Sequence, residues 1–301
     1  MKISAIIVVK NNPPHLFETL ESIRNFVSEI IIGDIDIGND YRKKLLENKK
    51  VRIVQLPSDI PFADLVKEDL KKQAKGEYIL YLDPDEIYPS ATLRTSPSLT
   101  TLMDKYDIFY FPRKNIIFGK WIEHSRWWPD YQLRLFKKES VIWPRQIHPV
   151  PKTRGKEYRF EAKQENAILH YNYDNLDQYL EKAIRYAKNE AQLRDNYSLT
   201  NALNDARTEF ISRYFAGNGF KDGMHGFALA ILQMFYYFLV YFYFWERKKY
   251  QNSEINIPVT YQGFVTNLYY ESSFWHDLKI LTFGVEKIKS KLKNTLFKML
   301  K

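Results

Sequence analysis

Two carboxylates follow an apolar segment near residue 80. Asp83 and Asp85 come directly after the run Glu77–Leu82 (EYILYL), and Glu86 is adjacent to them. Two carboxylates at this spacing can bind one hard cation, because Mg²⁺ and Mn²⁺ take oxygen ligands and commonly bridge protein carboxylates to a diphosphate. Asp-Pro-Asp is also a favourable turn sequence, so this motif alone leaves both interpretations open.

Polar side chains also follow two other apolar runs: Lys10–Asn12 after Ile3–Val9, and Asp34 and Asp36 after Glu29–Gly33. In a doubly wound sheet, ligands bind outside the carboxyl ends of the strands. The expected convergence of Asp34 with Asp83 and Asp85 at neighbouring strand ends therefore favours a site for a metal-bound diphosphate over a simple turn.

The first 90 residues predict the scaffold that these side chains need. Strands are expected at Ile3–Val9, Glu29–Gly33, Val51–Leu56 and Glu77–Leu82, and helices lie between them at 16–27, 41–48 and 62–74. Strand–helix alternation at this pace indicates an α/β fold with a mostly parallel, doubly wound sheet and helices on both faces.

The pattern changes after residue 107. Strands are expected at Asp107–Arg113 and Tyr131–Phe136, followed by helices at Leu176–Leu193 and Ala202–Ala216. The segment Gly223–Trp245 then has 23 residues without Asp, Glu, Lys or Arg. We expect a sheet domain over residues 1–173 and a helical region over residues 174–301.

Composition and charge exclude several classes of protein. The absence of cysteine excludes disulfide scaffolds, zinc–thiolate sites and cysteine nucleophiles. The net charge is +9, and seven lysines against two acidic residues place more than half of it within residues 276–301. No nucleic-acid-binding motif is present, so we expect no nucleic-acid partner. A localised basic tail suits an anionic membrane surface better.

Leu281, Val285, Ile288, Leu292, Leu296 and Met299 form one apolar stripe in this tail, which predicts a basic amphipathic helix over residues 279–301 lying in a membrane surface. Segment 223–245 is long enough to span a bilayer, but its four tyrosines favour docking at the interface, and a buried helix is the alternative. The helical region is also a candidate oligomer interface. No secretory signal leads the chain, so we expect a peripheral or monotopic protein at the cytoplasmic face of the inner (plasma) membrane.

Three early segments, Ile3–Asn12, Glu29–Asp34 and Tyr78–Glu86, together resemble the nucleotide-sugar half of a family 2 glycosyltransferase with a GT-A, Rossmann-like fold. Trp127–Phe136 (WWPDYQLRLF) is similar to a segment of the lipopolysaccharide-core glucosyltransferase branch. That branch is also matched by Ile147-His148, by His170–Ala191, and by Gly219–Gly223 followed by an aromatic stretch to Trp245-Glu246. The resemblance implies an inverting, metal-assisted transfer from a nucleotide sugar, with UDP expected, to a glycolipid or lipid-linked saccharide in envelope polysaccharide assembly.

The resemblance also implies roles for individual residues. Asp34 would bind the uracil or ribose, Asp83 the ribose or metal, and Asp85 the Mg²⁺ or Mn²⁺ on the diphosphate. Arg134 would neutralise charge on the leaving diphosphate, and Asp130 would deprotonate the acceptor hydroxyl. His148 is a candidate ligand of the metal or a phosphate. Asn11, where the family has an acidic residue, is a candidate contact for the nucleotide-sugar donor. The sequence after Asp34 also departs from the family pattern.

Each role has a structural alternative. Asp130 and Arg134 are four residues apart and could form an ion pair, and Glu86 is a rival base. We expect His124 and His170 to be structural, and His148 is as readily a hydrogen-bonded histidine as a ligand. For the whole protein there are two alternative functions. One is a metal-dependent nucleotidyltransferase, a class that usually has a Gly-rich phosphate loop, which Lys10–Pro14 does not provide. The other is a non-catalytic, membrane-bound scaffold that binds sugar nucleotides.

Overall fold

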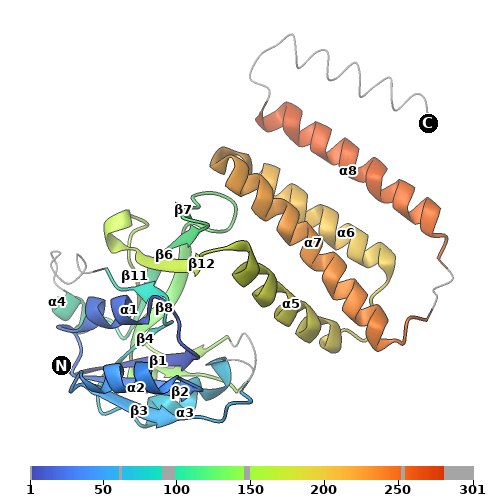
Figure 1. Ribbon diagram of the computed structural model, residues 1–301. Helices are drawn as coiled ribbons and strands as arrows, with labels where there is room; N and C mark the ends of the chain where they lie inside the picture. Colours follow the sequence, from blue (N-terminus) through green and yellow to red (C-terminus); the bar gives the residue numbers. More distant parts are fainter. Residues whose placement is uncertain (1, 61–62, 90–98, 146–149, 252–254, 281–301) are drawn as a thin grey trace. The chain divides into compact units, whose positions relative to one another are not determined.

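The computed structural model describes residues 2–60, 63–89, 99–145, 150–251 and 255–280. The chain forms two compact units (Figure 1). We call residues 1–116 and 129–172 the sheet unit, and residues 117–128 and 173–301 the helical unit. His148 and most of the predicted tail helix over 279–301 lie outside the described residues.

The sheet unit begins with four parallel strands, as the sequence predicts. They are β1 (Ile3–Lys10), β2 (Glu29–Ile35), β3 (Val51–Gln55) and β4 (Tyr78–Leu82), in the order β3-β2-β1-β4. Seven of the eight residues of β1 are buried, because helices cover both faces of this part of the sheet.

The helices divide between the two faces according to which side chains of β1 they contact. Helix α1 (Leu16–Ile23) and α2 (Asn39–Leu46) pack on the face that carries Ile3, Ala5, Ile7 and Val9. The short η1 (Ala63–Val66) and α3 (Lys67–Lys72) pack on the opposite face, which carries Ile6 and Val8. The predicted α/β class with helices on both faces is confirmed.

Beyond β4 the sheet is mixed, because most of the described pairings are antiparallel and one is parallel. The order continues β4-β8-β6-β12-β5, through β5 (Glu86–Ile87), β6 (Ile108–Ile117), β8 (Asp130–Lys137) and β12 (Ile168–Tyr173). The smaller elements are β7 (Lys120–Trp121), β9 (Val141–Ile142), β10 (Lys152–Thr153), β11 (Glu157–Arg159), α4 (Leu99–Met103), η3 (Lys138–Ser140) and η4 (Gln164–Asn166).

The helical unit contains α5 (Leu176–Leu193), α6 (Leu199–Phe210), α7 (Met224–Arg247) and α8 (Ile257–Lys279). Asn175, Ser198 and Asn256 cap α5, α6 and α8 by accepting hydrogen bonds from backbone N–H groups three residues on. The predicted helix over 202–216 is α6 followed by a π-helical segment, η5 (Ile211–Ala216), and the glycine-rich break leads into η6 (Gly219–Asp222). Helix α8 was not predicted.

Helix α7 packs against α5 and α6 (Figure 1). Val240 and Phe244 are buried with Ala187, Ala191 and Ala202 of the neighbouring helices. Phe227, Phe235 and Phe242 of the same helix remain 42–49% exposed. Among the described residues, α7 is long and apolar enough to cross a membrane, with a mean hydropathy of 1.7 and 22% of its most apolar window buried.

Candidate active site

The carboxyl ends of β1 and β2 both turn through left-handed backbone. Asn11 (φ 56°) and Asp36 (φ 64°) take this conformation, which Asn and Asp tolerate better than most side chains. The Asn11 N–H donates to the carbonyl of Ile35 at 3.1 Å, and this bond ties the two strand ends together. Asn11 is exposed at this edge, where the sequence predicts a contact with the nucleotide-sugar donor.

Asp34 is fully buried at the end of β2, and protein groups engage both of its carboxylate oxygens. Oδ1 accepts from the N–H of Ile37 at 2.8 Å, while Oδ2 accepts from Nη2 and Nε of Arg42 at 2.6 and 3.0 Å. The side chain of Arg42 is 35% exposed and also donates to Gln55. Arg42 therefore presents polar groups at this strand end, and Asp34 holds Arg42 in place. No local sequence pattern indicates this role for Arg42.

The end of β4 carries a network of two carboxylates and two guanidinium groups. Arg134 of β8 donates through Nη2 to Asp83 at 2.6 Å and to Glu86 at 2.7 Å, and Nη1 of Arg113 on β6 lies 3.2 Å from Glu86. Burial disfavours the charged form of Arg134, but Asp83 and Glu86 reverse this effect and raise its pKa. In the same way, Glu86, Asp130 and Asp83 outweigh burial and raise the pKa of Arg113. Both arginines therefore stay positively charged.

This network defines what Arg134 and Glu86 do in the structure. Arg134 is 4% exposed and compensates the charges of Asp83 and Glu86, whereas the sequence prediction assigns it to the diphosphate. Glu86 is fully buried, and its Oε2 accepts the backbone N–H of Asp83 at 3.1 Å. This burial disfavours Glu86 as the rival base and makes it a support for the Asp83 turn.

Asp130 lies at the start of β8, opposite Arg113 in the antiparallel pairing of β8 with β6. Its Oδ2 accepts from Nη2 and Nε of Arg113 at 2.6 and 2.8 Å and from Nδ2 of Asn115 at 3.1 Å. Its Oδ1 accepts from Gln132 at 2.7 Å. Asp130 therefore forms an ion pair with Arg113. The sequence spacing also allows an ion pair between Asp130 and Arg134, but the described contacts do not include one.

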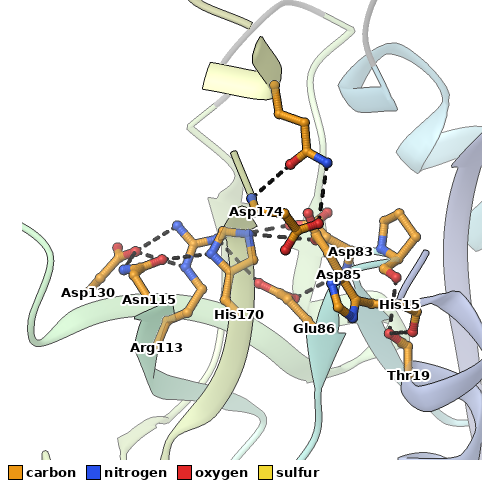
Figure 2. Close-up of polar contacts among 12 residues, drawn as sticks. His15, Thr19, Asp83, Asp85, Glu86, Arg113, Asn115, Asp130, His170 and Asp174 are labelled. Atoms are coloured by element: carbon orange, nitrogen blue, oxygen red, sulfur yellow. Dashed lines mark hydrogen bonds and ion pairs between the residues drawn. The ribbon is translucent and has the colours of Figure 1, made fainter. Parts of the chain in front are cut away.

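His170 of β12 faces Asp85 across the strand ends (Figure 2). Its Nε2 lies 3.6 Å from Oδ1 of Asp85, and its Nδ1 lies 2.6 Å from Oδ1 of Asn115. The antiparallel pairing of β12 with β5 sets His170 opposite Glu86, and the N–H of Tyr171 donates to the carbonyl of Asp85 at 3.0 Å. The sequence predicts a structural role for His170, because the pairing of β12 with β5 has no local sequence signal.

The side chains of Asp85 and His170 are of types that can bind a divalent cation. An imidazole nitrogen and a carboxylate oxygen are both ligands that a divalent cation can take, and here they lie 3.6 Å apart. Within the residues that the structure describes, no group of three His, Asp or Glu side chains converges on one point. Asp85 and His170 are thus the pair that could hold a metal, with Asp83 on the same turn. Oδ2 of Asp83 lies 2.6 Å from Nη2 of Arg134 and 4.0 Å from Nη1 of Arg113.

The tryptophan-containing loop 117–128 belongs to the helical unit. Asp222 accepts from the backbone N–H groups of Glu123 and His124 at 3.3 and 3.0 Å, and Nδ1 of His124 lies 3.1 Å from the same carboxylate. The rings of Trp121 and Trp128 meet edge to face at 5.3 Å. His124 therefore fixes the loop to η6, as expected of a structural histidine.

No family model matches the chain. Among solved structures, residues 1–349 of S. aureus TarS are 13% identical, with 85% of this chain and 95% of that chain covered and a TM-score of 0.44. A crystal structure of the same TarS segment in complex with UDP-GlcNAc is 15% identical, covers 76% of this chain and 79% of that one, and has a TM-score of 0.44. A crystal structure of GalNAc-T7 with UDP, GalNAc and Mn²⁺ is 17% identical, and the match covers 38% of this chain and 23% of that one with a TM-score of 0.28. At these identities and TM-scores the similarities assign no family, and we infer the function from the site itself.

Proposed function

We propose that the chain is a glycosyltransferase of the family 2, GT-A type, which transfers a sugar from a UDP-linked donor to an acceptor hydroxyl with inversion in a single displacement. One observation carries the proposal. Asp85 with His170, a candidate cation-binding pair, and Asp130, a candidate base, are connected through Asn115 at the carboxyl edge of a parallel sheet. Ligands bind at this edge in doubly wound sheets.

The proposed donor site uses the ends of β1, β2 and β4. Asn11 and Arg42 present polar groups where the nucleotide would lie, and Asp34 orients Arg42. Asp83, Asp85 and His170, with His148 as a further candidate, would hold the divalent cation. When bound, that cation supplies positive charge to the leaving diphosphate.

Asp130 has one oxygen suited to take the acceptor proton. Its Oδ2 already accepts from two nitrogens of Arg113 and from Asn115, while Oδ1 accepts in the described part of the chain from Gln132 alone. Oδ1 therefore retains lone-pair capacity. The acceptor oxygen gives its proton to this atom as it bonds to the anomeric carbon, and the bond from that carbon to the diphosphate oxygen breaks with its electron pair.

Binding of the nucleotide separates this proposal from its alternatives. Thermal unfolding with UDP-, GDP- and ADP-sugars, each with and without Mn²⁺, is expected to show stabilisation that is largest for a UDP-sugar with metal. Release of UDP from that sugar would demonstrate turnover and exclude a non-catalytic scaffold. Failure of every nucleotide sugar to bind in the presence of Mn²⁺ would refute the proposed function.

We further propose a glycolipid or lipid-linked saccharide acceptor and a peripheral or monotopic position at the cytoplasmic face of the plasma membrane. Helix α8 supports this, because Ile257, Val259 and Tyr261 are 57–62% exposed and residues 255–270 contain no charged side chain. Arg247, Lys248 and Lys249 are exposed where α7 ends. An uncharged, aromatic-rich first part of a helix that follows basic residues in the chain suits a bilayer with anionic headgroups.

The α8 surface can be tested by substitution. Val259→Glu and Val265→Glu are expected to reduce binding to vesicles that contain anionic lipid. Thr200→Glu, at an exposed position on α6, adds the same charge and serves as the control. Nucleotide binding by the variants should equal that of the native chain. Unchanged vesicle binding by both α8 variants would contradict a lipid contact through this helix.

A further inference from the structure

Asn115 lies on β6 between two groups of different chemistry. It is fully buried, its Nδ2 lies 3.1 Å from Oδ2 of Asp130, and its Oδ1 lies 2.6 Å from Nδ1 of His170. Figure 2 shows the resulting row Asp130–Asn115–His170–Asp85. A buried amide in such a row must match each neighbour with the correct donor or acceptor, because an unmatched buried polar atom is costly.

The chemistry of Asp130 determines which way the amide points. A carboxylate only accepts hydrogen bonds, and Asp130 forms an ion pair with the guanidinium of Arg113 at 2.6 Å. The NH₂ group of Asn115 must therefore face Asp130, which leaves its carbonyl oxygen to face His170. A carbonyl oxygen only accepts, so Nδ1 of His170 must carry a hydrogen.

This assignment decides what His170 presents to Asp85. A neutral imidazole carries one hydrogen, so with Nδ1 protonated its Nε2 carries a lone pair in place of a hydrogen. That nitrogen is the atom 3.6 Å from Asp85. Without the amide, the opposite tautomer would be favoured, because Nε2–H could then donate toward the Asp85 carboxylate. Asn115 and Asp85 thus favour opposite tautomers.

We propose that Asn115 is a positioning residue that holds His170 in the Nδ1–H tautomer and so keeps Nε2 available as a ligand beside Asp85. The same amide orients Asp130 through its NH₂ group, which fixes the candidate base relative to the cation-binding pair. The part that concerns the cation and the base rests on the proposed function. The tautomer does not, because it is a property of the ligand-free protein.

The tautomer can be measured directly by ¹⁵N NMR of histidine-labelled protein at about pH 8, above the ordinary histidine pKa of about 6.5. The spectrum of the native chain, with His170 assigned by comparison with His170→Gln, should show Nδ1 protonated. In Asn115→Leu, which is close in size and has no polar atom, the population should shift to Nε2–H. Retention of the Nδ1–H tautomer in this variant would overturn the proposal.

Two further variants separate this role from general packing. Gln132→Leu removes an amide that donates to Asp130 without contacting His170 in the described contacts, and should leave the tautomer unchanged. Asn115→Ala removes the same polar atoms as Asn115→Leu with a smaller side chain, so it should also shift the population to Nε2–H. It covers the case in which Asn115→Leu does not fold, and retention of the Nδ1–H tautomer in it would likewise overturn the proposal. A tautomer shift in Gln132→Leu would show that the tautomer responds to any change near Asp130 and would overturn the proposal.

Metal affinity supplies the second readout. Electron paramagnetic resonance titration of Mn²⁺ in the presence of UDP should show about 10–100-fold weaker binding for Asn115→Leu, the usual effect of removing a group that orients a metal ligand. Gln132→Leu should bind Mn²⁺ as the native chain does. Equal affinity in all three proteins would refute the metal part of the proposal. Absence of Mn²⁺ binding in the native chain, together with the expected tautomer shift, would instead refute the proposed function and leave the role of Asn115 supported.

Discussion

Arg113 and Asp130 lie directly opposite each other on β6 and β8, and Nη2 of Arg113 is 2.6 Å from Oδ2 of Asp130. The same guanidinium reaches Glu86, which is fully buried. Arg113 therefore stabilises one carboxylate that faces the proposed acceptor side and another that supports the Asp83 turn.

Removal of Arg113 is expected to destabilise the sheet unit. Arg113→Met leaves Glu86 buried with Arg134 as its remaining cationic partner in the described network, and breaking a buried ion pair from one side costs about 3–5 kcal/mol. Urea unfolding would measure the loss. Arg145→Met, which breaks an exposed pair with Asp69, is the control and should leave stability unchanged. Equal effects of the two substitutions would contradict the role of Arg113.

Asp85→Asn should abolish turnover and remove the metal-dependent part of UDP binding, because an anionic ligand is lost beside the diphosphate. Isothermal titration calorimetry with UDP, with and without Mn²⁺, provides the measurement. Asp69→Asn is a carboxylate-to-amide control in an exposed ion pair on α3 and should bind UDP like the native chain. Undiminished metal-dependent binding by Asp85→Asn would exclude Asp85 as a ligand.

Asp130→Asn should keep donor affinity and lower transfer about 10²–10⁴-fold, the usual contribution of a positioned base. The substituted amide cannot take a proton from the acceptor at Oδ1. Donor affinity and single-turnover transfer measured on the same preparation distinguish a base from a binding group. If UDP affinity falls as much as transfer does, Asp130 belongs to the nucleotide site or supports the fold.

Stability should fall in strongly alkaline solution because of Tyr78. Burial, followed by the charges of Asp107, Glu77 and Asp104, raises the pKa of Tyr78 from 10.0 to about 12, and its hydroxyl donates to the carbonyl of Met103 at 2.7 Å. The unfolded chain loses this proton near pH 10, whereas the folded chain keeps it to about pH 12. The contribution is therefore complete below pH 10 and is lost as the pH rises toward 12.

Urea unfolding between pH 9 and 12 would measure this loss. Tyr78→Phe should be less stable than the native chain at pH 9 and should show a shallower decline above pH 10. Tyr261→Phe, at an exposed position on α8, is the matched control and should retain the native pH dependence. A native slope in Tyr78→Phe would assign the alkaline decline to other groups.

Deletion of residues 281–301 should release part of the protein from anionic vesicles without affecting UDP binding, since six of the seven tail lysines lie in this segment. Sedimentation with vesicles of matched size, with and without anionic lipid, at low and high salt would measure the effect. Vesicle binding that is independent of the segment, or unaffected by salt, would refute the electrostatic part of the membrane proposal.

Elements whose signal is local could be predicted from the amino-acid sequence alone. The apolar run that forms β1 and the repeating apolar positions of α1 are readable over eight residues each, and α5 is found at its expected bounds, Leu176–Leu193. The reason is that burial on both faces of a strand or on one face of a helix requires a hydrophobic period that is visible in a short window. Asp83 and Asp85 were identified in the same way, because a strand end follows from the strand.

Which polar side chains meet depends instead on how the strands pair in the folded protein. Asp85 faces His170, and Asp130 faces Arg113, because antiparallel strands added after β4 set the register between segments far apart in the chain. Register depends on pairing and on the packing of both strands, and no local pattern encodes it. Sequence spacing therefore allowed Asp130 to pair with Arg134, four residues away on the same strand, whereas the fold gives Asp130 the arginine of the neighbouring strand and gives Arg134 to Asp83 and Glu86.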